Sequence, residues 1–400
     1  MVAVFFCLFS YVQPSDTNVY GQVNANIAQF SRYWEYVYET SSSGFRTSQG
    51  CLDHSGWYQL YELKTQAKFT SNFSLRYSFQ MLRHYEDTIT DHRFEPTLRL
   101  YKNLYAHMLI IPYYKKYHNE LGLGLSWRDE NHNWLAVYGI AKKFDHNFSL
   151  IPFKPGPQRD PFERIPLELE LDARYATDWL RFRLHADIDA PSHQYLDWPD
   201  SLWQVWEKDR DSSAAWTRLE VSPYKNIWLG ARASWRRERT LTRWPARGEV
   251  YFDTLKNVWF EPFIAISPTQ NLEFSFFYRL WDVSREMDSV TYYSDSDIFS
   301  CFARWQPLDY LVCETGYQRS KRERFNNGNP IGEPFRGRHG SVQSRLVFSL
   351  EFRLKSGIMF FIKEGLEMDR FPELTLRAPH NHTYVMIYMP LVLKAKKAID

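Results

Sequence analysis

The sequence predicts an all-β fold: a transmembrane, antiparallel, up-and-down β-barrel of about 18 strands, with about 16 as the alternative count. Three observations predict it: apolar and polar residues alternate with period two, short and long connectors alternate, and aromatic residues are abundant without a hydropathy peak. Aromatic residues make up 18% of the 400 residues, yet 24% are charged and the mean hydropathy is −0.50. No run approaches the roughly 20 apolar residues of a membrane-spanning helix, which excludes a helical membrane protein.

The alternation is clearest in three segments. In 165–174, leucines alternate with Glu168, Glu170 and Asp172, and 178–188 and 341–354 repeat the pattern with arginines. A helix would place neither set on one face, whereas successive side chains of a strand point to opposite sides of the sheet. We therefore expect strands with one lipid-facing and one water-facing side.

Connectors alternate between short and long. Turn-forming residues mark the short ones: Thr70-Ser71-Asn72, Ala176-Thr177-Asp178, Ser222-Pro223-Tyr224-Lys225, Ser267-Pro268-Thr269-Gln270, Gln306-Pro307-Leu308-Asp309 and Lys355-Ser356-Gly357. The longer polar connectors are predicted at 40–56, 87–93, 154–164, 190–213, 240–247, 284–296, 321–340 and 370–381. Short turns at one end and long loops at the other are typical of outer-membrane barrels. The first strand is expected within 18–38 and the last within 382–393.

Residues 1–17 are interpreted as the remnant of an export signal, and residues 18–400 as a single barrel domain. The apolar run 2–12 has signal-peptide length but lacks preceding basic residues, so an ordinary buried strand stays the alternative. The net charge of +2 offers no case for a nucleic-acid partner, and four cysteines make no disulfide scaffold.

The hairpin around Pro307 tests the assignment of faces. If it is symmetric, residues whose numbers sum to about 614 oppose each other, so that Cys301 meets Cys313. Ser300, Arg304 and Glu314 then share a polar face. The two cysteines fall on the apolar side, either as small lipid-facing residues or as a cross-strand disulfide.

Aromatic residues near strand ends favour a membrane barrel over a soluble sandwich. A soluble core would place large aromatic side chains in the middle of strands, whereas a barrel carries aromatic girdles at both membrane boundaries. The residues assigned to these girdles are Trp179, Trp228, Trp259, Trp281, Trp305 and Tyr310.

Strand parity predicts a charged, pore-lining set of side chains. Its members are Glu168, Glu170, Asp172, Arg174, Arg181, Arg183, Arg232, Arg236, Glu273, Glu314, Arg345, Glu351 and Arg353. One interpretation is a mixed-charge lining that selects ions and solutes. The other is that a wide barrel simply fills its interior with polar residues that pair across strands.

The segment 190–213 contains three tryptophans among acidic residues, an unusual composition for a freely solvated loop. Trp198, Trp203 and Trp206 are therefore predicted to form a constriction loop that folds inward. The alternative is a loop that packs its own tryptophans over the barrel mouth.

No enzyme, cofactor or metal site is expected. His339 and Ser341 form only a weak nucleophile–base signal, because His-x-Ser is common. His380 and His382, with the other scattered histidines, form no recognisable set of metal ligands.

The overall pattern resembles bacterial outer-membrane porins over nearly the whole chain after residue 17. The resemblance implies a location in the bacterial outer membrane and passive passage of small hydrophilic solutes or ions. It also implies contact with outer-membrane lipid and lipopolysaccharide, and leaves open assembly as a homo-oligomer. The alternatives are a non-conducting barrel that anchors partners and an outer-membrane lipid hydrolase using Ser341.

Overall fold

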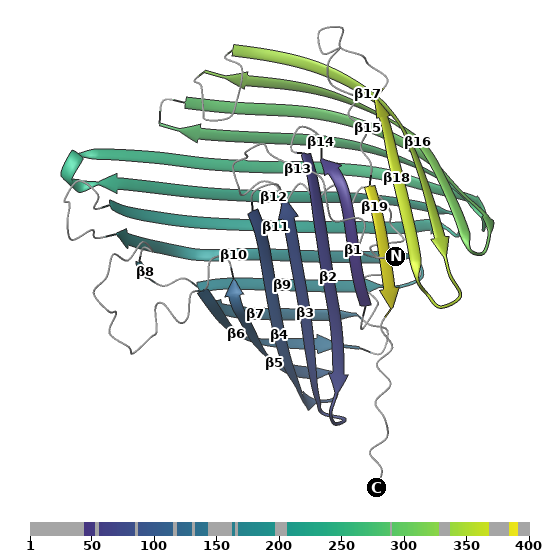
Figure 1. Ribbon diagram of the computed structural model, residues 1–400, viewed down its shortest axis with the longest axis horizontal. Helices are drawn as coiled ribbons and strands as arrows, with labels where there is room; N and C mark the ends of the chain where they lie inside the picture. Colours follow the sequence, from purple (N-terminus) through teal and green to yellow (C-terminus); the bar gives the residue numbers. More distant parts are fainter. Residues whose placement is uncertain are drawn as a thin grey trace, which may run out of the picture.

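The computed structural model describes residues 44–52, 56–84, 87–114, 118–129, 133–142, 162–164, 167–196, 206–288, 290–327, 337–367 and 384–390. Within these residues the chain forms one antiparallel sheet that wraps around itself (Figure 1). No helix in the described part is long and apolar enough to cross a membrane.

The strands follow one another along the chain with few interruptions. In the first half they are β1 (Gly44–Leu52), β2 (Gly56–Lys68), β3 (Phe73–His84), β4 (Asp87–Tyr101), β5 (Leu104–Tyr114), β6 (His118–Arg128), β7 (Trp134–Ala141), β8 (Phe162–Arg164), β9 (Leu167–Ala176) and β10 (Leu180–Leu196). In the second half they are β11 (Trp206–Tyr224), β12 (Ile227–Trp244), β13 (Glu249–Thr269), β14 (Leu272–Met287), β15 (Val290–Leu308), β16 (Leu311–Asn326), β17 (Gly337–Arg353), β18 (Met359–Glu367) and β19 (Tyr384–Pro390).

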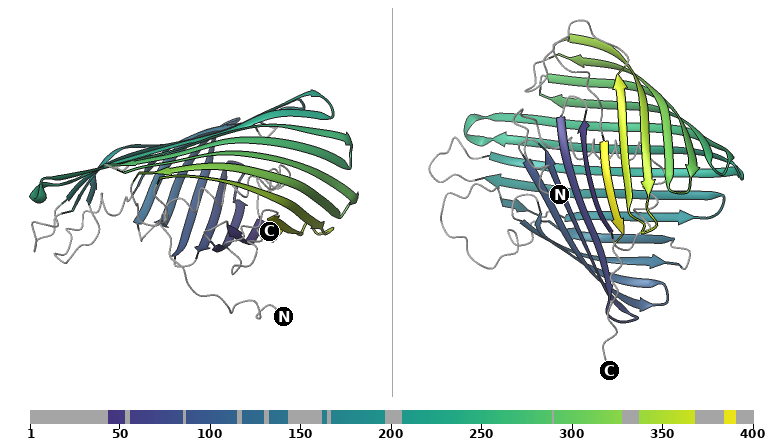
Figure 2. Two further views of the ribbon diagram at one scale, coloured as in Figure 1. Left: turned by 90° about the horizontal axis from the view of Figure 1, so that it is seen from above. Right: turned by 45° about the vertical axis from the view of Figure 1, so that its right-hand side comes forward.

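The pairings return to their starting point. Each strand pairs with the next along the chain, except that β9 pairs with β7 while the three-residue β8 pairs with β10. At the ends of the described chain, β1 pairs with β2 on one side and with β19 on the other. Eighteen of the 19 described strands thus form the ring, and β8 is the one left over. Figure 2 shows the first and last strands side by side.

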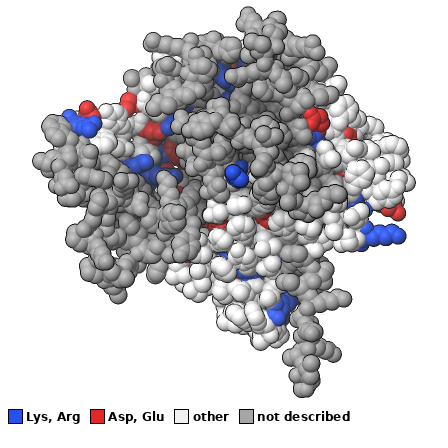
Figure 3. Space-filling view, in the orientation of Figure 1, with Lys and Arg blue, Asp and Glu red and all other residues white. Residues whose placement is uncertain are grey.

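Large apolar side chains cover the outer surface, the reverse of a soluble protein. On β6, Leu123 and Leu125 are 67% and 54% exposed, whereas the next residue, Ser126, is buried. The same alternation recurs on β14 and β17. On the face shown in Figure 3, the described surface is mostly uncharged, with charged side chains gathered in patches. An apolar exterior with all backbone groups paired in a ring is how a sheet crosses a membrane.

The chain reverses at or directly after each predicted short turn, and three of these turns share one construction. The strand before the turn carries a register shift at its proline: Pro223, Pro268 and Pro307 lie at such irregularities. The residue directly before the proline donates its backbone N–H to the turn of the preceding hairpin, as Ser267 N does to Asn226 O at 2.8 Å and Gln306 N to Asn271 O at 2.8 Å. Neighbouring hairpins are therefore hydrogen-bonded to each other at this end of the barrel, which we name the turn end.

Several predicted long connectors are instead strand. β1 occupies most of 40–56, and the paired ends of β10 and β11 occupy most of 190–213. The connector 240–247 shrinks to a 3₁₀ turn, Pro245–Arg247, ended by Gly248 at φ +65°. Similarly, β14 and β15 run through 284–296, and β4 begins within 87–93. These predictions were wrong because strands that extend beyond the membrane need no apolar face, and so lose the alternation that marks a strand.

The hairpin at Pro307 has a different register from the predicted one. Its turn is at Asp309 and Tyr310, so Arg304 faces Glu314, and Cys301 faces Tyr317 rather than Cys313. The predicted assignment of residues to the inner and outer faces is still correct, because the register differs from the predicted one by an even number of residues. Both cysteines are free thiols, so the disulfide alternative is wrong.

The remaining sequence predictions on structure fall outside the described residues. They are the export remnant 1–17, the first strand within 18–38, the connector 370–381, residues 154–161 of the connector 154–164, and residues 328–336 of the connector 321–340. The core of the segment 190–213, at 197–205, falls there as well.

Candidate functional site in the barrel interior

A long-range ion pair identifies the inner face of the sheet. Arg93 on β4 donates to both carboxylate oxygens of Glu170 on β9, at 3.2 and 3.3 Å. Four strand spacings of about 4.8 Å separate β4 from β9 along the sheet. Two side chains can bridge that span only across the concave side. Glu170 and every position that shares its parity therefore face the barrel interior.

The strand register carries this assignment around the ring. Arg174 faces Arg183, Arg183 faces Arg218, and Arg218 faces Arg232. The register continues through β13 to β17 and places all members of the predicted pore-lining set on the inner face: Glu168, Glu170, Asp172, Arg174, Arg181, Arg183, Arg232, Arg236, Glu273, Glu314, Arg345, Glu351 and Arg353. Their role in lining a pore stays a prediction.

Four of the inner arginines lie in one row across adjacent strands. We name Arg174, Arg183, Arg218 and Arg232 the arginine row. Like charges directly opposite each other repel, so the row needs compensation. Part of it comes from Glu220, whose carboxylate lies 2.7 Å from Arg218, and part from Trp216, whose ring centroid lies 5.2 Å from the Arg183 guanidinium.

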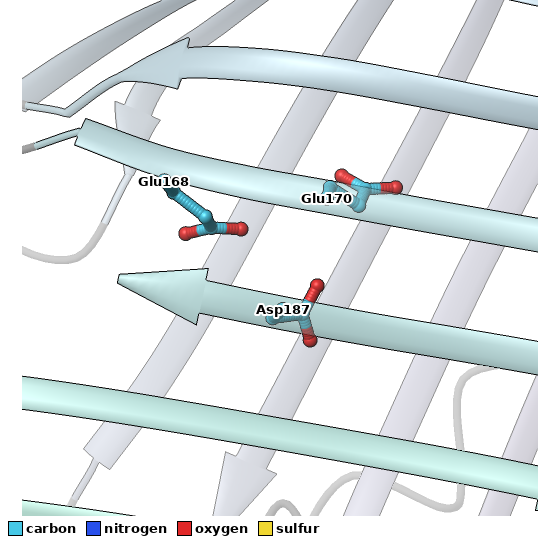
Figure 4. Close-up of side chains that lie close together, drawn as sticks. All are labelled: Glu168, Glu170 and Asp187. Atoms are coloured by element: carbon cyan, nitrogen blue, oxygen red, sulfur yellow. The ribbon is translucent and has the colours of Figure 1, made fainter. Parts of the chain in front are cut away.

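Acidic residues gather farther from the turn end on the same strands. Glu168, Glu170 and Asp187 lie close together on β9 and β10, with carboxylate oxygens within 4.8 Å of one another (Figure 4). Cations within the protein hold this group: the Lys142 ammonium bridges Glu168 and Asp189, and Arg93 binds Glu170. We name Glu168, Glu170, Asp187 and Asp189 the acidic group. Arginines near the turn end and carboxylates beyond them thus polarise this wall along the barrel axis.

A buried ion triad lies farther around the ring, on β12 to β14. Glu261 accepts from Arg279 at 2.8 Å and lies 3.5 Å from Arg232. All three residues are nearly inaccessible, at 2–4% exposed. The guanidinium of Arg279 stacks on Trp259 at 4.5 Å, and that of Arg232 lies 5.3 Å from the ring of Phe263. The three side chains of this ion triad (Arg232, Glu261, Arg279) together carry a net charge of +1.

Glycine on the inner face recurs opposite an aromatic residue. Gly124 faces Tyr138, Gly230 faces Phe263, and Gly316 faces Phe302. In each pair the ring lies over the glycine, so that an added Cβ would come within 2.1–2.4 Å of ring carbons. The missing side chain is what lets the ring lie flat against the wall, an arrangement known to stabilise strand glycines.

The sequence reasoning missed several inner-face residues. Glu95, His107, Ser126 and Tyr138 form a connected hydrogen-bond network on β4 to β7. For Ser126, the strand face can be read from the run HNELGLGLSWR at 118–128, where leucines alternate with Gly122, Gly124 and Ser126. No local signal, however, indicates which inner residues of different strands meet.

The predicted aromatic girdle is only partly correct. Trp179, Trp305 and Tyr310 are exposed, at the turn end, as expected. By contrast, Trp228 stacks on inner-face Arg181 at 4.2 Å, Trp259 on Arg279, and Trp281 donates to Asn257 at 2.8 Å. These three face the interior, where an arginine-rich wall offers cation–π partners.

The other predicted site residues are only partly described. Trp198 and Trp203 lie outside the described residues, as do His380 and His382, and Trp206 is the first residue of β11. His339 and Ser341 lie within β17, opposite Arg324 and Arg322. The constriction role of the three tryptophans therefore stays a prediction.

A ring of antiparallel strands with an apolar outer surface and a charged interior defines the class: the protein is a transmembrane β-barrel. No protein-family model matches the chain, and no curated protein matches it. Among solved structures it is similar to OprD of Pseudomonas aeruginosa, with a TM-score of 0.46, 10% identity, and coverage of 89% of this chain and 96% of that one.

Two further solved structures show the same level of similarity. OccK5 of Pseudomonas aeruginosa gives a TM-score of 0.42 at 11% identity and covers 88% of this chain and 99% of that one. OmpT of Vibrio cholerae, in a trimer form, gives 0.40 at 10% identity and covers 87% and 97%. At these values the likeness carries no argument about function, which rests on the interior of this barrel.

Proposed function

We propose that this protein is a porin-like channel of the bacterial outer membrane for passive passage of small hydrophilic solutes or ions. The observation that carries the proposal is the charged inner face, continuous from β9 to β17, in a ring of eighteen strands. Barrels of 16 to 18 strands are wide enough to leave an aqueous channel. The partly exposed charges of this inner face, such as Arg181 and Arg236, are the ones that act on a passing solute or ion.

Conductance in a planar lipid bilayer tests this function directly. We expect purified, refolded protein to insert and to give discrete conductance steps in about 1 M salt. Folding is checked first by comparing the gel mobility of boiled and unboiled protein, since a folded barrel runs differently. A protein that is folded and inserted yet never conducts would support the alternative, a non-conducting barrel that anchors partners.

The arginine row and the acidic group make ion selectivity the sharper test. Arg183 lies at the centre of the row, so Arg183→Glu inserts a negative charge among three arginines. In a salt gradient, we expect the reversal potential to shift toward cation preference, because a charged wall sets the local counter-ion concentration. Arg247→Glu, in the exposed turn after β12, is the matched control and should leave the reversal potential within error. Equal shifts for both variants would contradict a selective role for the row.

The outer surface supports a lipid partner. Beyond the apolar part of β12, outward-facing positions become basic at Arg237, Arg239 and Arg243, with Asp211 and Asp209 of β11 paired to the last two at 3.1 and 2.6 Å. Basic side chains just beyond the apolar part of the barrel surface are suited to bind the phosphates of lipopolysaccharide. Protection of the folded barrel against heat by added lipopolysaccharide, reduced in Arg237→Ser, is the expected result. Assembly as a homo-oligomer remains a prediction, to be checked by light scattering in detergent.

A further inference from the structure

Three inner-face side chains on consecutive strands form a directional hydrogen-bond relay. On β4, the Glu95 carboxylate Oε1 lies 2.8 Å from Nδ1 of His107 on β5. The opposite ring nitrogen, Nε2, lies 2.5 Å from the hydroxyl Oγ of Ser126 on β6. A carboxylate, an imidazole and a serine hydroxyl in this order are the elements that activate a serine nucleophile. We name Glu95, His107 and Ser126 the relay.

The strand register explains how these side chains meet. His107 lies directly opposite Gly124, which presents no side chain, so the imidazole reaches diagonally to Ser126 two residues along β6. The space over Gly124 is filled by the ring of Tyr138, which meets the imidazole edge-on at 5.5 Å between centroids. The imidazole is thus held in one orientation from three sides.

The acid end of the relay is held equally firmly. Glu95 accepts from the Tyr138 hydroxyl at 3.2 Å and lies 3.5 Å from the Arg76 guanidinium. Thr97 contributes a further contact, with its hydroxyl 3.2 Å from His107 Nδ1. A neighbouring guanidinium favours the ionised carboxylate, and an ionised Glu95 accepts the proton of Nδ1. The lone pair of Nε2 then points at Ser126, the tautomer that a general base requires.

A cationic side chain lies on the same strand face as the serine. Arg128 is two residues after Ser126 on the same face of β6, about 7 Å along the strand. Its guanidinium lies 5.6 Å from the ring of Trp134, and its Nε is buried without a hydrogen-bond partner in the described part of the chain. Because this buried N–H is on the same strand face as the nucleophile, it is the group that would stabilise a developing oxyanion.

We propose that the relay is the catalytic site of a serine esterase inside the barrel, close to the turn end, acting on acyl esters small enough to enter the lumen. Ser126 Oγ attacks the ester carbonyl carbon and its proton passes to His107 Nε2. The tetrahedral intermediate, with its oxyanion toward Arg128, expels the alcohol, which takes the proton from Nε2. Water from the lumen then attacks the acyl-serine with His107 again as base, releasing the carboxylic acid and restoring the hydroxyl. The activity departs from the sequence-based expectation of no enzyme and does not depend on conduction.

Other polar contacts in the described interior lack one member of the relay. Ser300 accepts from Gln318 at 3.3 Å, and Ser294 accepts from Arg322 at 3.0 Å. His185 contacts Asp187 at 3.2 Å, a histidine–acid pair for which the structure gives no serine contact. Ser300 is therefore the matched control for Ser126, because both are inner-face serines that are 6% exposed.

The test uses the full chain, refolded in detergent, with a tagged fluorophosphonate and p-nitrophenyl acetate as probes. We expect the fluorophosphonate to modify Ser126, located by peptide mass spectrometry, and ester hydrolysis to fall at least about 100-fold in Ser126→Ala. Ser300→Ala should keep both labelling and hydrolysis. His107→Gln should lose labelling while Ser126 is still present, which a merely structural serine would not explain.

Folding of each variant is verified by its heat-dependent gel mobility before activity is compared. Glu95→Gln keeps the size of the side chain, so it separates loss of the acid from loss of packing. The proposal is overturned if folded wild-type protein is not labelled at Ser126, or if Ser126→Ala hydrolyses the ester as fast as wild type. Conductance is measured on the wild type separately, so that a non-conducting barrel that still hydrolyses esters refutes the channel alone.

Discussion

Two sectors of the inner wall are built on the same plan and end in different chemistry. In both, a glycine faces an aromatic ring, Gly124 with Tyr138 and Gly230 with Phe263, and one carboxylate lies buried beside that ring. Glu95 is partnered mainly by groups that exchange protons, whereas Glu261 lies between two permanently charged guanidinium groups. Both carboxylates are buried, so burial does not distinguish the two sites. The groups that contact the carboxylate decide whether the site can transfer a proton or contributes only fixed charge.

Removing the carboxylate from the ion triad should have the largest effect. Glu261→Ala removes the carboxylate that the buried Arg232 and Arg279 share, and breaking these buried ion pairs is expected to cost about 3–5 kcal/mol in the free energy of unfolding. Urea unfolding in detergent, followed by tryptophan fluorescence, measures it. Glu249→Ala, at an exposed position, should change the value by less than about 0.5 kcal/mol. A loss below about 1 kcal/mol for Glu261→Ala would mean that water in the lumen solvates both arginines.

The equivalent change in the other sector should cost less. Glu95→Ala removes the hydrogen bonds to His107 and Tyr138 and the ion pair with Arg76, whose side chain is partly exposed and stays solvated. The expected destabilisation is therefore about 1–3 kcal/mol. The same urea titration compares the two variants. Equal losses for Glu95→Ala and Glu261→Ala would break the distinction between neutral and permanently charged partners.

Alanine at the ring-covered glycines should act alike in both sectors. In Gly124→Ala the new Cβ would lie 2.2 Å from a ring carbon of Tyr138, and in Gly230→Ala 2.4 Å from one of Phe263. Forcing each ring away is expected to cost about 1–3 kcal/mol. Gly139→Ala, with nothing within 4 Å of its Cβ, is the control and should be neutral or stabilising. If only one of the two glycine variants loses stability, the two sectors share the same arrangement of residues but not the same packing energetics.

The smallest effect is expected for a charged cluster beyond the membrane. The hydrogen bond from His193, with Arg243 nearby, lowers the pKa of Asp209. A lowered folded-state pKa contributes stability above the unfolded value of about 3.9, and this stability is lost as pH falls through the folded value. Asp209 is well exposed, so Asp209→Asn should remove less than about 1 kcal/mol at neutral pH and slightly flatten the loss of stability below pH 4. Unfolding midpoints at pH 6 and pH 3 give the comparison; a steeper acid loss in the variant contradicts it.

What the sequence determined by itself is the face on which each side chain lies. Alternation with period two is local, and any even error in register preserves it, so the pore-lining set from Glu168 to Arg353 falls on one side although the hairpin at Pro307 was predicted with the wrong register. The turn residues were equally readable, because proline, asparagine and glycine restrict the backbone wherever they occur.

Only the tertiary structure decided which inner residues meet. Arg93 reaches Glu170 because the sheet curves across four strand spacings, and His107 reaches diagonally to Ser126 because Gly124, directly opposite it, has no side chain. The strand ends within 190–213 could not be recognised either, since above the membrane neither face has to be apolar. Faces follow from the covalent geometry of the strand, whereas the relay, the ion triad and the arginine row follow from the stagger and curvature of the ring.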